Sequence, residues 1–470
     1  MKQHKSPSRR HFLAFSVAGL ALATAACSKT ETAAVRTAAA GTAIDGGTAL
    51  FGTGVSHQLS LSWNEDDYQG MIDAYGTDSS KEWISADLTI DGVLIKNVGV
   101  RLKGNSTLRT LGGSGGMGGK NFPDGAPNGG TRPTDMPTGA AGRGGGNYPG
   151  GMGGGMGASN GISADVPQSL PLLIRFDKYV KGTKYQGLTE LALRPGSPVI
   201  NEALALGLTA ATGQASQRFA YASYSVNGSE TQSRLLLENP AEDYADALDN
   251  GKTVLFKADS ESSFSYQGDD KATYEEQFKQ LNQEDTQDLA PIIDFLKWLG
   301  EADDATFEAQ LANWVDVPSF ARYTATQNLL ANTDDMAGPG QNYYLGYNVE
   351  TKLLTVISWD LNMAMSSNAT ASPEQSLTMG GGGSGGRGGN PLKSRFLAAA
   401  SFKKLYDSAY VELYSQMYSS GKALELLEQI TASIPSSDAL TSDSIATSSA
   451  TVKAFAQKRT ESLKSQLPAA

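Results

Sequence analysis

Two carboxylates and two side-chain amides lie close together in the second half of the chain. Asp360 and Asn362 follow the apolar, β-branched stretch TVISW. Asp334 and Asn342 lie upstream, in the segment NTDDMAGPGQN. Carboxylate and amide oxygens are ligands for hard cations such as Mg²⁺, and a second Asp can orient an acceptor hydroxyl during phosphoryl transfer. The pattern therefore indicates a metal–phosphate site, with turns and helix caps built from the same residue types as the structural alternative.

A hairpin is the element that would position these residues. Residues 342–348 and 353–359 both read as strands, and VETK supplies a turn between them. Antiparallel pairing then holds Asn342 and Asp360 at neighbouring ends of the two strands. A carboxylate at the end of an apolar strand is fixed by the strand and open to a ligand.

Histidine and cysteine usage excludes several other chemistries. The three histidines are His4, His11 and His57, and the first two fall in the predicted signal. A mature chain with one histidine and at most one cysteine cannot form a Cys/His zinc site. A Ser-His-Asp triad would need His57, which lies in the alternating stretch VSHQLSLSW and reads as a strand residue. Catalysis would therefore rely on carboxylates, amides, Lys and Arg.

The charge balance argues against nucleic acid as a partner. The chain has 470 residues, 40% of them hydrophobic, so it can bury a large core. Its formal net charge is −11. Nucleic-acid binding needs a basic footprint, which this composition does not provide.

The N-terminus reads as an export signal. Residues 1–27 combine a basic start, including Ser8-Arg9-Arg10-His11-Phe12-Leu13, with a short apolar run that ends in Ala25-Ala26-Cys27. The pattern resembles a twin-arginine signal that ends in a lipobox, with Thr24 in place of the usual Leu. We predict lipidation at Cys27, attachment to the membrane through that lipid, and exposure on the periplasmic or extracellular face of a bacterial envelope. A plain signal with a chance cysteine is the alternative.

Strands precede helices along the chain, which predicts an α+β fold with two lobes: antiparallel strands first and a helical C-terminal part. Two glycine-rich segments interrupt the pattern and lack any apolar period. The predicted boundaries are a flexible tether at 28–50, a main domain at 51–365 with a Gly/Met-rich insert at 111–165, a Gly-rich loop at 366–391 and a helical region at 392–470.

Methionines in the glycine-rich segments raise a separate hypothesis. Met117, Met152, Met156 and Met379 carry thioethers, which are soft ligands for Cu(I). Such a copper-handling module would stand on an otherwise inert fold. The alternative interpretation is that these segments are flexible, solvent-exposed loops that bind no metal.

Several separated motifs occur over about residues 55–365: ADLTIDGVLIKNVGVRLKGNST, RFDKYVKGTKYQGLTELAL, INEALALGLTAATGQASQRFAYASYSVNG, LLLEN, LFKAD, NLLANTDDMAGPGQNYYLGY and ISWDLN. In sequence and in order, these motifs resemble those of the spore coat protein CotH kinase family. The resemblance implies an atypical protein-kinase-like fold. It also implies ATP-dependent phosphorylation of Ser in an exported or cell-surface protein, with Mg²⁺ or Mn²⁺.

The same resemblance implies roles for individual residues. Asp334 would be the catalytic Asp, and Asp360 would bind metal with the amides of Asn342 and Asn362. The residues implied near the nucleotide are Arg101, Lys103, Asn105, Ser106 and Lys257, with Glu202 or Glu238 pairing an ATP-orienting lysine.

Two positions depart from the family pattern. Asn362 stands where the family motif closes with Asp, and an amide brings no charge to a metal. The segment VPQSLP stands where the family has lysines, leaving Lys120 or Lys257 as substitutes. Loss of a phosphate-orienting lysine can abolish transfer while the fold persists. The alternative function is therefore a catalytically decayed, pseudokinase-like scaffold lipoprotein that binds a cell-surface partner.

Overall fold

The computed structural model describes residues 35–52, 54–104, 107–108, 111, 161–377 and 389–468. They belong to one compact unit, Val35–Ala470. The predicted signal with Cys27, the motif residues Asn105 and Ser106, Lys120 and the four methionines of the glycine-rich segments lie outside the described residues. Within the described part of the chain, no helix is long and apolar enough to cross a membrane.

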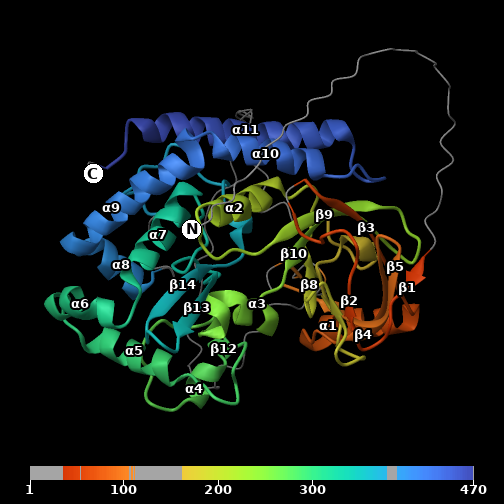
Figure 1. Cartoon of the computed structure of the whole chain (residues 1–470), viewed down its shortest axis with the longest axis horizontal. Coiled ribbons are helices and arrows are strands. Elements are labelled where there is room, and N and C mark those ends of the chain that lie inside the picture. Colours follow the sequence, from red (N-terminus) through yellow and green to blue (C-terminus); the bar gives the residue numbers. More distant parts are fainter. Residues whose placement is uncertain are drawn as a thin grey trace, which may run out of the picture. The chain divides into compact units, whose positions relative to one another are not determined.

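Eight strands of the described residues form one sheet that closes on itself (Figure 1). Their order is β1-β5-β4-β3-β9-β10-β8-β6, and β5 also pairs with β6. The strands are β1 (Arg36–Thr37), β3 (Ser56–Trp63), β4 (Ile84–Ile90), β5 (Val93–Leu102), β6 (Leu172–Arg175), β8 (Glu190–Leu193), β9 (Phe219–Val226) and β10 (Gln232–Glu238). Closure removes the exposed edges that would otherwise remain at β5 and β6.

The sequence pattern explains most of this sheet. Residues of β3 alternate strictly between exposed and buried, which places one face of the strand on the core. The predicted hairpin at Asp91-Gly92 joins β4 and β5, and both turn residues have positive φ. Most strand pairs are antiparallel, as predicted, but β3–β9 and β1–β5 are parallel. The long stretch of chain between β3 and β9 lets the strand return in the same direction.

The N-terminal segment is built into the fold from residue 35 onward, so the tether predicted for 28–50 does not extend that far. β1 adds to the closed sheet, and β2 (Ala43–Ile44) pairs with β7 (Lys184–Tyr185). His57 is buried and bonds to Asp91 Oδ2 at 2.6 Å and to the Leu50 carbonyl at 2.9 Å. These contacts give His57 the structural role predicted for a strand residue and fasten residues 43–50 to the sheet.

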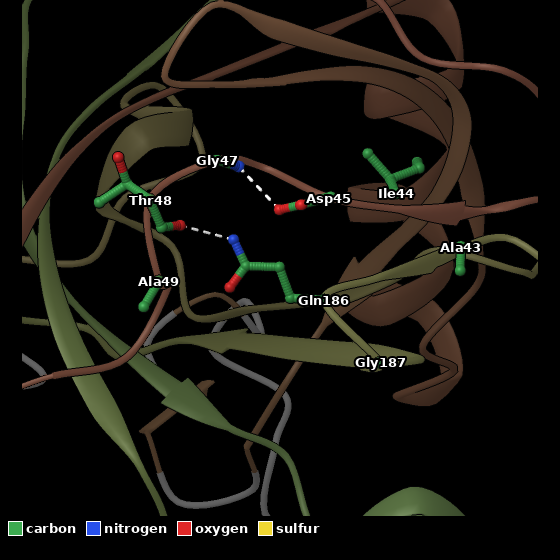
Figure 2. A pocket seen from close by; sticks show the side chains of 8 residues that line it. All are labelled: Ala43, Ile44, Asp45, Gly47, Thr48, Ala49, Gln186 and Gly187. Carbon is green, nitrogen blue, oxygen red and sulfur yellow. Dashed lines mark hydrogen bonds between the residues drawn. The ribbon is translucent and has the colours of Figure 1, made fainter.

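A hollow of about 460 Å³ lies beside this segment, lined by residues 43–45 and 47–49 and by Gln186 and Gly187 (Figure 2). Gln186 Nε2 donates to the Thr48 carbonyl at 2.6 Å, and the Gly47 N–H donates to Asp45 Oδ1 at 2.9 Å. Asp45 is the one charged side chain among its lining residues. The hollow shares no residue with the predicted site.

The second sheet of the described residues has four strands in the order β12-β11-β13-β14, all antiparallel. The strands are β11 (Thr253–Ala258), β12 (Phe278–Gln280), β13 (Tyr343–Asn348) and β14 (Leu354–Ser358). Tyr343 pairs with Ser358, so the ends of β13 and β14 lie side by side. The predicted hairpin is confirmed, and it brings Asn342 and Asp360 to the same end of this sheet.

Helices cover both sheets and form the C-terminal part, as predicted (Figure 1). They are α1 (Glu65–Asp78), α2 (Ile200–Ala211), α3 (Glu242–Ala247), α4 (Ala272–Glu275), α5 (Ala290–Glu301), α6 (Asp304–Gln310), α7 (Val317–Leu329), α8 (Pro391–Ala398), α9 (Ala400–Tyr414), α10 (Lys422–Ser433) and α11 (Ser442–Lys464). One apolar cluster fills the closed sheet, and another joins the second sheet to α2, α5, α7 and the C-terminal helices.

Arg459 of α11 ties the C-terminal helices to the segment that carries the predicted site. Its side chain is fully buried, and its guanidinium donates to the carbonyls of Asn328, Leu329 and Ala371. It also donates to the Asn328 side chain at 2.9 Å. The end of α7 is therefore fixed from outside the second sheet.

Arg459→Met is expected to lower the free energy of unfolding by about 3 kcal/mol, because several buried carbonyls would lose their donor at once. Denaturant unfolding followed by circular dichroism measures this change. Lys458→Met, at the exposed neighbouring position, is the control and should stay within about 0.5 kcal/mol of the parent protein. Equal unfolding free energies for both variants would contradict the role given to Arg459.

Candidate functional site

The Asp334 carboxylate is held at both oxygens by the loop between α7 and β13. Oδ1 accepts the Gly340 N–H at 2.7 Å, and Oδ2 accepts the Asn342 side-chain amide at 3.0 Å. The same amide also donates to the Asp334 carbonyl at 3.1 Å. Burial raises the pKa of Asp334, and the nearby Asp360 adds to the rise, while the Gly340 N–H opposes it. The loop therefore presents one oriented carboxylate next to Asp360.

Two glycines allow the loop to pack closely around the Asp334 carboxylate. A Cβ at Gly340 would lie 2.5 Å from Asp334 Oδ2 and 2.9 Å from Asn342 Nδ2. A Cβ at Gly338 would lie 2.6 Å from the Asp334 Cα. Real Cβ atoms do not approach other atoms this closely, so the carboxylate can sit here only because both neighbours lack side chains.

Gly340→Ala is expected to lower the free energy of unfolding by about 1–3 kcal/mol, because the new methyl must push the Asp334–Asn342 contact apart. Gly300→Ala in α5 is the matched control, since an added Cβ there meets nothing within 4 Å. That control should be neutral or raise stability by up to about 1 kcal/mol. Thermal and denaturant unfolding compare the two; an unaffected Gly340→Ala protein would show that the loop adapts freely.

Asp360 follows β14 in a left-handed conformation, with φ 52°. Its Oδ1 forms an ion pair with Arg194 Nη2. Arg194 follows β8 and also donates from Nε to Glu202 Oε2 at 2.8 Å. Glu202 lies in the first turn of α2 with its side chain fully buried. Arg194 thus bridges the acid of α2 and the acid at the end of β14.

Burial and charge act on this bridge in opposite directions. Burial lowers the pKa of Arg194, but the adjacent Asp360 and Glu202 outweigh it, so the pKa is raised overall. Burial raises the pKa of Glu202 to about 7, although the adjacent Arg194 opposes the rise. One oxygen of Glu202, Oε1, has no hydrogen-bond partner among the described residues. The guanidinium therefore stays charged and neutralises Asp360.

Two lysines flank Trp359, the residue before Asp360. Lys103 Nζ lies 5.3 Å from the ring centroid and Lys257 Nζ lies 5.4 Å from it, both within cation–π range. Lys103 also donates to Asn239 Oδ1 at 2.8 Å, and Asn239 in turn donates to Glu190 Oε2 at 2.6 Å. β5, β11 and β14 bring these groups together.

The lysines lie close enough to repel each other and are held mostly out of water. Burial, then the charges of Lys257 and Arg194, lower the pKa of Lys103 to about 7. Burial also lowers the pKa of Lys257. Because part of the Lys103 side chain remains exposed, an incoming anion can reach it. Groups with such shifted pKa values in one place are typical of functional sites.

The positive cluster extends to the end of β5. Arg101 lies with its guanidinium carbon 4.9 Å from the Trp83 ring centroid, and burial lowers its pKa. Burial, then the charges of Arg101 and Lys257, lower the pKa of Lys81. The cluster of Lys81, Arg101, Lys103, Lys257 and Arg194, called here the Trp359 cluster, gathers cations in a chain of net charge −11. Such a concentration of one charge favours an anionic ligand.

Most of the described residues predicted for the site come together, but Glu238 does not. Glu238 binds Arg218 through two hydrogen bonds, of 3.0 and 2.6 Å, and so belongs to a separate pair. Asn362 accepts a hydrogen bond from Asn201 through its backbone carbonyl at 2.8 Å. The acid predicted to pair a lysine, Glu202, pairs an arginine instead.

Sequence reasoning missed Arg194 and Asn239. Arg194 directly follows the apolar stretch LAL. A single cation at the end of a buried strand was the sequence feature that could have indicated its role. The segment VPQSLP, where the family pattern has lysines, lies next to Lys103. The backbone N–H of Lys103 donates to the Pro171 carbonyl at 2.9 Å. Lys103 therefore lies beside the place where the family pattern expects a lysine.

A divalent metal at this site would need oxygen ligands from the side chains around Asp360. No group of three or more His, Cys, Asp or Glu side chains that could hold a metal occurs within the described ranges. Asp360 Oδ2 and Asn342 Oδ1 accept no hydrogen bond from these residues, so one carboxylate oxygen and one amide oxygen are available. An Asp and an Asn are the protein ligands that protein kinases give to Mg²⁺, so the residues fit a metal whose other ligands come from phosphate and water.

A second hollow, of about 280 Å³, lies next to the Asp334 loop. Asp335 lines it and pairs with Lys393, and the side chains of Gln327 and Asn332 complete that wall. Asp335 thus faces a different environment from Asp334, although the two residues are adjacent.

Comparison with known proteins gives one family match. The model of the CotH kinase protein family matches residues 157–465, more than half of the chain. This range includes the Asp334 loop and Asp360 but begins after the motif at residues 101–106. No curated protein sequence matches the chain.

Two solved structures show weak likeness. One is the Shewanella oneidensis MR-1 toxin–antitoxin complex of HipA and HipB with operator DNA, at 12% identity and TM-score 0.33, covering 59% of this chain and 59% of that chain. The other is the Helicobacter pylori proinflammatory kinase CtkA, at 11% identity and TM-score 0.32, covering 64% of this chain and 88% of that one. These scores are too low to support conclusions about the site. The family match does support one: the chain belongs to the CotH kinase protein family.

Proposed function

We propose that this protein transfers the terminal phosphoryl group of ATP to a Ser hydroxyl of an exported or cell-surface protein. The observation that carries the proposal is the Trp359 cluster, with Asp334 and Asp360 at its edge. It combines a site for a polyanion with an oriented carboxylate, the two parts that phosphoryl transfer requires.

The phosphates of ATP would lie among Lys103, Lys257 and Arg194. Each cation is mostly buried, so its attraction for phosphate oxygens is stronger than in water. Phosphate would also relieve the mutual repulsion that lowers the pKa of Lys103. Arg101 extends the positive surface toward the outer face of β5.

Asp334 would orient the acceptor hydroxyl. Its two oxygens each accept one hydrogen bond, and each retains a lone pair for a further donor. Its raised pKa makes it a stronger base than a free Asp, which suits a group that receives the Ser proton.

Asp360 and Asn342 would hold a divalent metal ion, Mg²⁺ or Mn²⁺, which when bound neutralises charge on the transferred phosphoryl group. Arg194 already neutralises part of the charge of Asp360 in the ligand-free protein. Asn362 provides no charge and uses its backbone carbonyl to accept from Asn201.

The export signal and Cys27 support a place in the bacterial cell envelope. We propose attachment to the membrane through a lipid on Cys27, with the domain on the periplasmic or extracellular face. The acceptor would then be a protein at the same surface. Mass measurement of the mature N-terminus tests the lipidation, since an unmodified Cys27 contradicts it.

A second candidate is nucleotide binding without transfer, in a scaffold that binds a cell-surface partner. The ion pair between Arg194 and Asp360 favours it, because this contact occupies an oxygen that a catalytic metal would use. Transfer assays on the Asp334 variant described in the Discussion separate the two candidates.

Calorimetric titration of the full chain with ATP and Mn²⁺, beside an Asp360→Asn variant, tests the proposed function. We expect binding that weakens at least about tenfold in the variant, since a tenfold loss corresponds to one metal contact of modest strength. Absence of binding to the well-folded parent protein would overturn both candidates, because each requires a bound nucleotide.

A further inference from the structure

We propose that Arg194 is an internal cation that keeps the affinity of Asp360 for a free divalent metal ion low. The site would then acquire its metal together with the phosphates of a nucleotide. This inference rests on the proposed function, and it concerns the order in which the ligands can bind.

The first observation is the bridging geometry. Arg194 contacts Glu202 through Nε and Asp360 through Nη2, and its side chain is only 16% exposed. Glu202 is fully buried and has no second cation among the described residues, so it anchors one side of the guanidinium. The positive charge is therefore fixed beside Asp360.

The second observation is the shortage of other metal ligands. Both oxygens of Asp334 accept hydrogen bonds, and the described residues contain no group of three or more His, Cys, Asp or Glu side chains that could hold a metal. A free divalent ion would have to displace Arg194 from Asp360 Oδ1 or share the carboxylate with it. Two cations on one carboxylate repel strongly in a partly buried site.

A bound nucleotide would change the hydrogen-bond partners of Arg194. A guanidinium has five N–H donors, so Arg194 can keep Nε on Glu202 while Nη2 turns from Asp360 to a phosphate oxygen. Asp360 then regains a full negative charge next to the phosphates. Phosphate oxygens supply the ligands that the protein lacks, and the metal becomes favourable only at that stage.

The test is a Mn²⁺ titration of the full chain, without nucleotide, followed by electron paramagnetic resonance of the free ion. Arg194→Met alone would leave Glu202 buried without a partner, so the principal variant is Arg194→Met with Glu202→Gln. This pair of changes keeps the net charge of the site constant and replaces a buried ion pair with neutral groups, which folds tolerate. We expect one Mn²⁺ site to bind at least about tenfold more tightly in the double variant.

Two controls assign the effect to Asp360. Adding Asp360→Asn to the double variant should abolish the gain, whereas weak binding elsewhere on the acidic surface should persist. Arg322→Met breaks the ion pair between Arg322 of α7 and Glu412 of α9 and should leave Mn²⁺ affinity unchanged. Equal Mn²⁺ affinity of the parent protein and the double variant would overturn the role of Arg194.

The proposed function can fail separately. If ATP binds to none of the variants while the double variant gains the Asp360-dependent Mn²⁺ site, the control of metal affinity by Arg194 is supported and the kinase function is not. If ATP binds and Mn²⁺ affinity does not respond to Arg194, the kinase function survives and this inference is wrong.

Discussion

Asp334→Asn is expected to reduce phosphoryl transfer by about 10²–10⁴-fold, the usual contribution of a positioned general base. The amide has almost the same shape as the carboxylate but cannot receive a proton from the acceptor hydroxyl. It can still accept the Gly340 N–H through its one oxygen. Its new NH₂ group faces the Asn342 amide, which must turn to present its oxygen for the loop to keep its course. Transfer from radiolabelled ATP to Ser-containing envelope proteins, or to the chain itself, measures the effect.

The same variant separates chemistry from binding. Asp334 does not belong to the Trp359 cluster, so ATP affinity should change by no more than about threefold, less than the loss of one good contact. Asp294→Asn, on the exposed face of α5, is the matched control and should leave transfer unchanged. Equal transfer by the Asp334 variant and the parent protein would remove Asp334 from the chemistry.

Lys103 should make nucleotide affinity depend on pH. Its pKa of about 7 in the ligand-free protein is lowered mainly by burial, and only its charged form attracts phosphate. Bound phosphate would restore the charged form, so affinity should fall as the pH rises above 7. Between pH 7.5 and 9.0, where ATP itself no longer titrates, the dissociation constant should rise roughly 20-fold.

Two substitutions test this origin of the pH effect. Lys103→Arg keeps its charge throughout this range, so its pH dependence should nearly disappear. Lys103→Met should bind about 10–100-fold more weakly than the parent protein at pH 7.5, because a buried charge-assisted contact is lost. Calorimetry in buffers of different ionisation enthalpy should also show proton uptake at pH 8.5. An affinity that is constant from pH 7.5 to 9.0 would contradict the account of Lys103.

The sequence predicted those parts of the site that local patterns determine. The alternating stretches around Gly346 and Thr355 form the β13–β14 hairpin, so the approach of Asn342 to the end of β14 followed from strand pairing. The turn-rich segment after α7 placed Asp334 beside Asn342, a contact across only eight positions of the chain. Lys103 and Lys257 came from motifs of the resembling family, and the structure brings both to Trp359.

Contacts between distant segments escaped prediction. Arg194 and Asp360 are 166 positions apart, and Lys103 and Asn239 are 136 apart. The Lys103–Asn239 contact depends on the pairing of β5 with β6, of β6 with β8 and of β8 with β10, and no local pattern encodes those registers. The Arg194–Asp360 contact joins the end of β8 in one sheet to the end of β14 in the other. The short strands β1 and β2 were not predicted for another reason. Each has only two residues, too few to show an alternation of apolar and polar side chains, so the segment was interpreted as part of a tether.

The two acids that were offered as alternatives show why residue type alone does not decide a role. Glu202 and Glu238 are both buried acids, and both pair with an arginine. Glu202 lies at the start of α2, which faces the end of β14, so its partner Arg194 reaches Asp360. Glu238 pairs with Arg218, whose guanidinium carbon lies 5.1 Å from the Phe51 ring centroid on the N-terminal segment.

The most direct measurement of the central claim is labelling with an acyl-phosphate derivative of ATP. A lysine amine next to the bound phosphates attacks the acyl carbonyl, forms an amide and releases the nucleotide. Peptide mass spectrometry of the full chain should find the label on Lys103 or Lys257, and excess ATP should prevent it. Exposed Lys458 and Lys404 should react slowly and without competition by ATP. Labelling confined to such exposed lysines, with Lys103 and Lys257 unmodified, would show that the Trp359 cluster does not bind nucleotide phosphates.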